Sequence, residues 1–344
     1  MSANTLIRNP LWATLLAALV AAMVSYLVFV PNSEAAPAAD GKYYPYIING
    51  EPVPNGKYPF MVALLDQSRP GTNIDKLLCG GSLIDNTHVL TAGHCVSAAQ
   101  RTGPPVLVPK RQDLQVLVGR TVLTSDQGHV RNVKAVDVHP KYPGGPQTEP
   151  FDVAVLTLSR AVRGIKPIEL ATSNQNNLER PGRHATVAGW GSTKPRRPCA
   201  RVGDEVIANH LQEVQVPIVS DSRADKVLQQ VPPQCPPGTP SPDVFFSQLM
   251  IAAGGAEDKG SCQGDSGGPL FVRTSGHDDN GRNGDDDNGG KYTQIGITSF
   301  TTGCGYGIPD VYTEVNAQPI ASFIERTADN GDGDNGNGDN GDDK

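Results

Sequence analysis

The chain of 344 residues has no excess of positive charge and none of the common motifs that hold metals or phosphates. Its 29 lysine and arginine residues are outnumbered by 36 aspartate and glutamate residues, giving a formal net charge of −7. We therefore expect no basic surface and no nucleic-acid partner. His-x-x-x-His and Cys-x-x-Cys pairs are absent, as is a glycine-rich phosphate loop, so the sequence implies no cofactor and no metal site.

Helical periodicity is also scarce. Short runs rich in Val, Ile, Leu and Thr are separated by Gly, Pro, Asn and Asp, a pattern typical of strands joined by turns. The clearest runs are Leu114–Val118, Val153–Leu158, Thr186–Ala188 and Gln294–Ser299. The pattern predicts an all-β protein. One exception lies at 317–327, where Ile320, Phe323 and Ile324 have helical spacing and predict a terminal helix with core contacts.

The N-terminus carries the single long apolar run. Arg8 precedes this run, which extends from Leu11 to Val30, and Ser33-Glu34-Ala35 resembles a small-x-small cleavage site. Residues 1–35 are therefore interpreted as a secretory signal peptide. The alternative is an uncleaved anchor at 11–30, because the run is nearly long enough to span a membrane. Both interpretations place the rest of the chain outside the cytoplasm. Residues 36–46 are a pro-segment or linker.

Two tracts rich in Asp, Asn and Gly have a composition that cannot bury a core. They are Gly276–Gly290 and the acidic tail at 328–344. Disorder or a mobile loop is the expected state of both. Calcium binding is the alternative, although neither tract has the ligand and glycine spacing of an EF-hand loop.

Three short motifs carry the chemistry. Leu90-Thr91-Ala92-Gly93-His94-Cys95 supplies a histidine, Phe151-Asp152-Val153-Ala154 an aspartate, and Gly264-Asp265-Ser266-Gly267-Gly268-Pro269 a serine among glycines. A serine hydroxyl needs a base to take its proton and donors to stabilise the oxyanion that it creates. The chain order histidine, aspartate, serine is the order of the chymotrypsin-type triad.

These motifs resemble those of the chymotrypsin-like, trypsin-fold serine proteases, and the resemblance extends from about Ile47 to Thr327. It implies two six-stranded antiparallel Greek-key barrels, at about 47–165 and 166–315, with the active site between them. It also implies a secreted, monomeric endopeptidase that acts through an acyl-enzyme on protein or peptide substrates and meets protein inhibitors. In that scheme His94 is the general base, Asp152 orients it, Ser266 is the nucleophile, and the N–H groups of Gly264 and Ser266 form the oxyanion hole.

Two other functions stay open. A catalytically silent binding protein could keep the same fold, although such proteins usually lose a triad residue and this chain has all three. A surface-anchored protease could use its acidic tracts to bind cations or a partner. Labelling with a fluorophosphonate separates the silent protein from the enzyme, and membrane fractionation tests the anchor.

The resemblance also implies substrate-binding residues. Trypsin-like enzymes have an aspartate six residues before the serine, where this chain has Gly260. Asp310 is expected on the opposite pocket wall, which favours a broad preference with a basic component. Thr301, where relatives have glycine, is expected to narrow the pocket entrance. Further contacts are expected from Ser261, Ser299 and Phe300.

Activation by cleavage is implied by Ile47-Ile48-Asn49-Gly50, which resembles the start of the mature enzymes of that family. The new α-amino group of Ile47 would then pair with Asp265. Tyr46 precedes this position, so the activator would cleave after tyrosine, or trimming would proceed from Lys42.

Six cysteines fit an oxidising compartment and allow fifteen pairings. The resemblance selects Cys79 with Cys95 and Cys262 with Cys304. Cys199 and Cys235 remain and would pair by elimination.

Overall fold

The computed structural model describes residues 47–97, 110–144, 150–198, 205–230, 245–255, 259–274 and 291–331. Several of the features singled out above lie outside these ranges: the segment 1–46, the tract at 276–290, most of the tail, Cys199 and Cys235. Within the ranges, no helix is both long and apolar enough to cross a membrane.

Six antiparallel strands close into a first barrel in the order β2-β3-β4-β7-β6-β5. They are β2 (Met61–Asp66), β3 (Leu77–Leu83), β4 (His88–Thr91), β5 (Leu114–Val118), β6 (His129–Val138) and β7 (Ala154–Leu158). The barrel closes because β2 pairs with both β3 and β5. Every residue of β2 and β4 is buried, so neither strand alternates between a buried and an exposed face.

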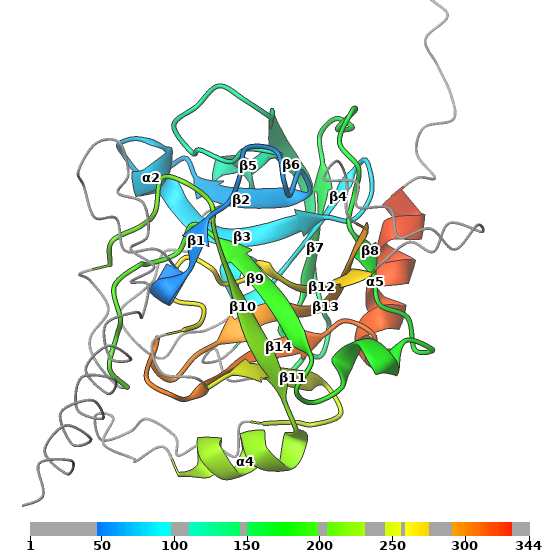
Figure 1. The fold of residues 1–344 in the computed structure, drawn as a ribbon. Helices are drawn as coiled ribbons and strands as arrows, with labels where there is room; N and C mark the ends of the chain where they lie inside the picture. The colour runs from blue at the N-terminus through cyan, green and yellow to red at the C-terminus, as the bar shows by residue number, and fades with distance from the viewer. Residues whose placement is uncertain are drawn as a thin grey trace, which may run out of the picture. The chain divides into compact units, whose positions relative to one another are not determined.

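A second closed barrel follows in the order β9-β10-β11-β14-β13-β12, and β12 pairs with β9 to complete the ring. Its strands are β9 (His184–Gly189), β10 (Gln212–Val219), β11 (Met250–Gly254), β12 (Pro269–Thr274), β13 (Lys291–Phe300) and β14 (Pro309–Glu314). Two short strands join this sheet: β1 (Glu51–Pro52) pairs with β10, and β8 (Glu169–Leu170) runs parallel to β13. The prediction of two six-stranded antiparallel barrels is confirmed (Figure 1).

The remaining elements of the described ranges are short, except for two helices. The short ones are η1 (Ile47–Asn49), α2 (Asn73–Lys76), α3 (Gly93–Val96), η2 (Arg111–Asp113) and η3 (Asn176–Glu179), and the longer ones are α4 (Asp221–Gln229) and α5 (Gln318–Gly331). The predicted terminal helix is α5, and Ile320, Phe323 and Ile324 are all buried. Its observed end is four residues beyond the predicted one, at a glycine, where a helix commonly stops.

The two barrels share one continuous hydrophobic core. Tyr58 and Phe60, which precede β2, pack edge-on against Phe271 of β12, with ring centroids 4.9 and 5.4 Å apart. A buried hydrogen bond from Ser82 Oγ to Gln294 Oε1, 2.6 Å long, joins β3 to β13. These contacts fix the junction at which residues of both barrels meet.

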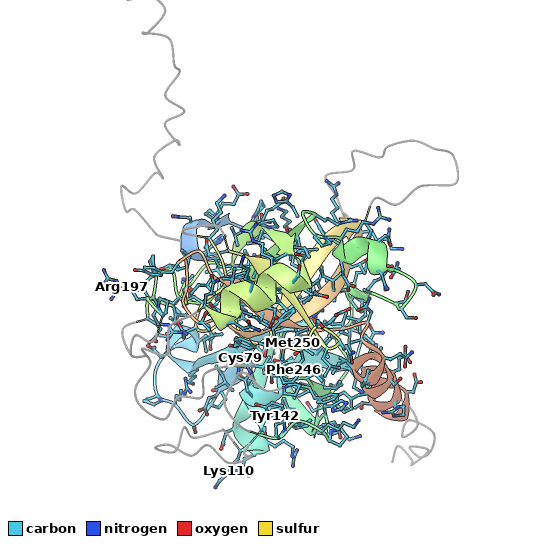
Figure 2. All side chains as sticks on the ribbon, turned by 90° about the horizontal axis from the view of Figure 1, so that it is seen from below. Cys79, Lys110, Tyr142, Arg197, Phe246 and Met250 are labelled. Carbon is cyan, nitrogen blue, oxygen red and sulfur yellow. A yellow bond between two sulfur atoms is a disulfide. The ribbon has the colours of Figure 1, made fainter. Side chains whose placement is uncertain are left out.

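Packing behind β14 supports the second barrel. Leu228 of α4, Met250 of β11, Phe300 and Val311 form a small buried cluster. Figure 2 shows Met250 and Phe246 on the side of the molecule that carries α4, and the Phe246 amide donates to Met250 Sδ at 3.5 Å. Phe300, which is expected at the substrate pocket, is therefore held in place by its packing against this buried cluster.

Candidate active site

His94 and Asp152 form a dyad at the junction of the barrels. His94 belongs to α3, directly after β4, and its Nδ1 lies 2.8 Å from Asp152 Oδ2. The backbone N–H of His94 donates to Asp152 Oδ1, also at 2.8 Å. Because one carboxylate receives both the ring and the backbone of the same residue, the imidazole has little freedom to turn.

The segment around Asp152 is a tight turn before β7. Phe151 has a positive φ of 63°, which is uncommon for a residue other than glycine, and the Val153 amide donates to the Phe151 carbonyl. The Phe151 ring stacks on His139 with centroids 4.7 Å apart, and His139 Nε2 contacts the Pro319 carbonyl of α5. His139 thus supports the turn and the terminal helix, away from the dyad.

Asp152 is fully buried, so its carboxylate needs compensating donors. A third donor comes from the second barrel, where Ser299 Oγ donates to Asp152 Oδ2 at 2.6 Å. The Thr313 hydroxyl donates a hydrogen bond to the backbone carbonyl of Asp152 at 2.9 Å. An ionised carboxylate only accepts, so the dyad assigns the proton to His94 Nδ1 and leaves Nε2 as the basic nitrogen.

Ser266 lies in a glycine-rich turn that is fastened to both barrels. The Gly80 amide donates to the Ser266 carbonyl, and the Gly267 amide donates to the Thr298 carbonyl, each at 2.7 Å. Gly267 has a φ of +79°, and a Cβ there would lie 2.6 Å from the Gly80 carbonyl oxygen. Only glycine fits this position, so the sequence motif is required by the close approach of β3.

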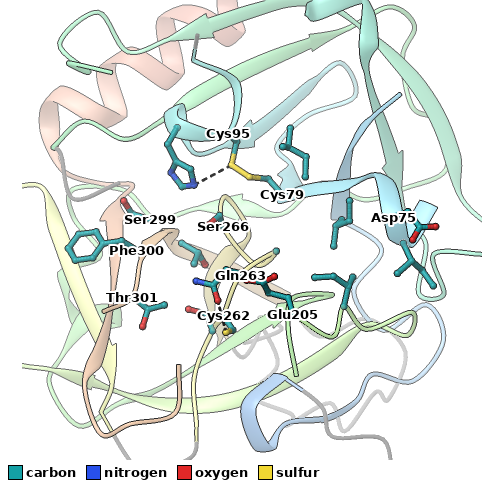
Figure 3. A pocket seen from close by; sticks show the side chains of 18 of the residues that line it. Asp75, Cys79, Cys95, Glu205, Cys262, Gln263, Ser266, Ser299, Phe300 and Thr301 are labelled. Atoms are coloured by element: carbon teal, nitrogen blue, oxygen red, sulfur yellow. Dashed lines mark hydrogen bonds between the residues drawn. A yellow bond between two sulfur atoms is a disulfide. The ribbon is translucent and has the colours of Figure 1, made fainter. Parts of the chain in front are cut away.

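Ser266 and His94 line one cleft of about 490 Å³. His94 Nε2 is 3.7 Å from Cys95 Sγ in this structure, the contact drawn as a dashed line in Figure 3. A sulfur contact of this length is weak, so it competes little with a hydroxyl group for His94 Nε2.

Gly264 and Ser266 also line the cleft. In the described part of the chain the neighbouring amides of Asp265, Gly267 and Gly268 donate to carbonyl oxygens, whereas those of Gly264 and Ser266 donate to none there. Gly264 has a φ of +98°, and a Cβ there would approach Gly191 Cα to 3.0 Å. Two amides without protein acceptors beside a serine hydroxyl can receive a developing oxyanion.

Asp265 is buried, and its carboxylate lies between Gly191 and Cys262. Its carboxylate accepts from the amides of Gly191 at 2.7 Å and Cys262 at 2.9 Å. Burial raises the pKa of Asp265 to about 7, with a smaller contribution from Asp310. Ile47 is fully buried, and Ile48 packs on the Cys262–Cys304 disulfide.

Gly260 and Asp310 are brought together. Asp310 Oδ2 accepts from the Ser261 amide at 2.7 Å and from Ser261 Oγ at 2.9 Å. Asp310 is 3% exposed, and burial raises its pKa to about 6. Ser261 and Thr301 line the cleft, so Asp310 lies directly behind its wall. Ser299 and Phe300 line the same part of the cleft.

The structure contains the Cys79–Cys95 and Cys262–Cys304 disulfides, the two pairs that the resemblance implied. The first lies beside His94, and the second is the support for Ile48.

Sequence reasoning missed the other arm of the cleft. It is lined by Arg69, Ile74, Asp75, Leu77, Leu78, Glu205, Ile207 and Gln263. One signal was available: Thr72 and Asp75 have the spacing of a capping box, and their side chains form that motif at the start of α2. It indicated an ordered turn between β2 and β3 but not where that turn would point.

Two antiparallel six-stranded barrels, with this histidine, aspartate and serine where they meet, define a serine endopeptidase of the chymotrypsin type. The model of the family described as Trypsin matches residues 47–324, and the chain belongs to this family.

Its relatives include enzymes from distant sources. The chain is 33% identical over 273 residues to a trypsin of Saccharopolyspora erythraea, covering 79% of this chain and 94% of the relative. It is 30% identical over 283 residues to the venom peptide isomerase heavy chain of Agelenopsis aperta, with 79% and 96% covered. It is 28% identical over 276 residues to the proclotting enzyme of Tachypleus tridentatus, with 78% and 63% covered.

Proposed function

We propose that this endopeptidase hydrolyses peptide bonds through an acyl-enzyme, with Ser266 as nucleophile, His94 as general base and Asp152 as the group that orients His94. The observation that carries the proposal is the threefold donation to the buried Asp152 carboxylate, because it leaves Nε2 of His94 as the basic nitrogen of the ring, in the cleft that Ser266 also lines. A base held in one tautomer can take the serine proton as the hydroxyl attacks.

The reaction then follows from the positions of the groups. Ser266 Oγ adds to the scissile carbonyl while His94 Nε2 accepts its proton, and the resulting oxyanion receives the amides of Gly264 and Ser266. Nε2 returns the proton to the leaving amine, which departs and leaves an ester on Ser266. A water molecule, deprotonated by the same nitrogen, hydrolyses this ester and restores the serine.

Activation by cleavage before Ile47 belongs to the same proposal. A buried carboxyl such as Asp265, with two amide donors and a pKa of about 7, lacks a full counter-charge. An α-amino group on Ile47 would supply that charge beside the Ser266 loop. Cleavage after Tyr46 requires an activator that accepts tyrosine, or stepwise trimming from Lys42.

Primary specificity is set by Gly260 and Asp310 in this proposal. A carboxylate behind Ser261 attracts a cationic side chain, while the apolar Phe300 and the absence of a charge at Gly260 admit large apolar side chains. Thr301 narrows the entrance to the pocket. The expected result is cleavage after both basic and apolar residues.

Export is the last element. A signal peptide at 1–35 would direct the chain out of the cytoplasm, and two disulfides among the described residues suit an oxidising compartment. Retention of the apolar run at 11–30 would instead anchor the enzyme to a membrane.

The experiment is replacement of the nucleophile. Ser266→Ala in the processed enzyme is expected to reduce kcat/KM on peptide substrates by at least about 10,000-fold while the protein stays folded. A folded variant with activity comparable to that of the wild type would show that Ser266 is not the nucleophile and would overturn the assignment.

A further inference from the structure

Glu213 of β10 has a buried carboxylate that the proposed mechanism does not use. Only 6% of its side chain is exposed, and its Oε1 forms an ion pair with Lys57 Nζ at 2.5 Å. The Tyr58 hydroxyl donates to the other oxygen, Oε2. Burial is the largest cause that raises the pKa of Tyr58, and the bond to Glu213 adds to it, so the hydroxyl stays protonated. Both carboxylate oxygens therefore have a donor from the segment between β1 and β2.

The two donors are themselves held in place. The Tyr58 ring packs edge-on against Phe271 of β12 and Tyr292 of β13, with centroids 4.9 and 5.1 Å away. Lys57 Nζ lies 4.9 Å from the centroid of the Tyr58 ring. Lys57, Tyr58 and Glu213 thus form one fixed unit, the Glu213 clamp.

The backbone of Glu213 pairs with β1. Glu51 is the antiparallel partner of Glu213, and Pro52 is that of Gln212 (Figure 1). β1 has only these two residues, so its pairing alone gives little stability. Two glutamates in directly opposite positions also repel each other. The positive charge of Lys57 offsets this repulsion, and the clamp therefore holds β1 against β10.

The turn Ile47–Gly50 lies directly on the backbone of Glu213. A Cβ on Gly50 would lie 2.5 Å from the Glu213 carbonyl oxygen and 3.1 Å from the Ile47 carbonyl oxygen, closer to the first than real Cβ atoms come. The Gly50 amide donates to the Ile47 carbonyl, and Asn49 has a φ of +52°. A shift of β10 at Glu213 would therefore move this turn.

The other side of the same turn leads to Asp265. Ile47 and Ile48 are 0% and 1% exposed, and Ile48 packs on Cys262. The Cys262 amide donates to the Asp265 carboxylate at 2.9 Å. The turn Ile47–Gly50 is thus in contact with Glu213 at one end and with a residue that holds Asp265 at the other.

We propose that Glu213 is a positioning residue for activation. Through the clamp it fixes the turn Ile47–Gly50, so that the α-amino group created by cleavage before Ile47 meets the Asp265 carboxylate. The inference rests on the proposed function, because the cleavage and the ion pair with Asp265 are taken from it. Glu213 touches no substrate and takes no part in the acyl transfer.

The test measures how well the Ile47 amine is held. Cyanate carbamylates a neutral, accessible α-amine and spares one that is kept as an ammonium ion in a buried pair. A free α-amino group has a pKa of about 8, so an unpaired one reacts at pH 8. Chain processed to begin at Ile47 is treated with cyanate at this pH. Peptide mass spectrometry follows the modification, and hydrolysis of a p-nitroanilide follows the activity.

We expect Glu213→Ala to carbamylate at Ile47 at least about tenfold faster than the wild type and to lose activity in parallel, because hydrogen bonds to a charged group are lost. Lys57→Met keeps the bond from Tyr58 and should give a smaller increase, and it serves as the test if Glu213→Ala does not fold. Glu169→Ala is the matched control. It removes an ion pair with Lys291 in which both side chains are 47% exposed, and should change neither rate.

Thermal unfolding separates positioning from general support of the fold. Processing should raise the Tm of the wild type, because the ion pair with Asp265 forms only then. Glu213→Ala should lose most of this gain, in addition to any loss that it shows in the unprocessed chain. An equal loss in both forms would assign Glu213 a structural role alone.

That equal loss, or carbamylation of Glu213→Ala and Lys57→Met at the wild-type rate, would overturn the positioning role while anilide hydrolysis still supports the enzyme. A wild-type Ile47 that cyanate modifies as fast as an exposed α-amine would overturn the activation scheme itself, and the role of Glu213 with it.

Discussion

The carboxylate of Asp310 occupies the space that a side chain at Gly260 would need. A Cβ on Gly260 would lie 2.7 Å from Asp310 Oδ2, closer than real Cβ contacts allow. A side chain at position 260 and the Asp310 carboxylate therefore cannot occupy this space together, and Asp310 supplies the negative charge behind Ser261.

Removal of that carboxylate should separate the two classes of substrate. Asp310→Ser is expected to lower kcat/KM for cleavage after Arg or Lys about 10- to 100-fold, because a hydrogen-bonded charge pair is lost. Cleavage after Leu or Phe should change little. Steady-state kinetics on peptides that differ only in the residue before the scissile bond give this comparison. Undiminished basic cleavage would show that another group recognises the cation.

The acidic residue cannot simply be moved to position 260. Gly260→Asp alone should produce an inactive or poorly folded protein, because its side chain collides with Asp310 and adds a second buried charge. The double variant Gly260→Asp with Asp310→Gly should recover folding and strengthen the preference for Arg and Lys. Thermal unfolding and the same peptide series measure both effects. A stable and active single variant would contradict the collision.

Basic cleavage should also depend on pH. Burial raises the pKa of Asp310 to about 6, so the carboxylate is charged above that pH and neutral below it. The ratio of kcat/KM for an Arg peptide to that for a Leu peptide should fall as the pH drops from about 7 to 5. Taking the ratio cancels the titration of groups that serve both substrates, and Asp310→Ser should abolish the dependence. A flat ratio in the wild-type enzyme would exclude Asp310 as the titrating group.

A second buried acid affects stability. Glu314 of β14 faces Glu179 of η3 and is also close to Asp221, and burial is the main cause that raises its pKa from 4.5 to about 8. Burial also raises the pKa of Glu179, whose Oε2 accepts from Asn316 Nδ2 at 3.1 Å. The geometry suits one proton shared between the two glutamates.

The sign of the resulting pH dependence is fixed. Below pH 4.5 Glu314 is protonated in both the folded and the unfolded chain, and its contribution to the free energy of unfolding is fully present. As the pH rises toward 8 the unfolded chain loses this proton first, so the free energy of unfolding falls. Glu314→Gln should remove this loss and stabilise the protein at pH 8 by on the order of 1 kcal/mol relative to wild type. Thermal melts of both proteins between pH 5 and 8 test it, and parallel pH profiles would contradict it.

Much of the fold could be predicted because its strands are local patterns. The run Leu114–Val118 forms β5. Ile320, Phe323 and Ile324, which have helical spacing in the sequence, form the buried side of α5. The dyad could be predicted from motifs, since the histidine and aspartate keep their flanking residues although 58 positions separate them.

Other features depend on tertiary packing and left no local signal. Glu179 and Glu314 are ordinary acids in the sequence and become coupled only because η3 packs beside the end of β14. Ile207 looks like any apolar residue until the chain places it 3.3 Å from the position of a Gly264 side chain. Asp310 could be placed on the pocket wall, but its bonds to both donors of Ser261 required coordinates.

The most direct test of the account is covalent labelling of the nucleophile. Chain processed to begin at Ile47 is treated with a fluorophosphonate, and the modified residue is located by peptide mass spectrometry. We expect one adduct per molecule on Ser266, with labelling slowed at least about 1,000-fold in His94→Ala and much weaker in the unprocessed chain. An adduct at another residue, or equal labelling of Ser266 without His94, would contradict the proposed mechanism.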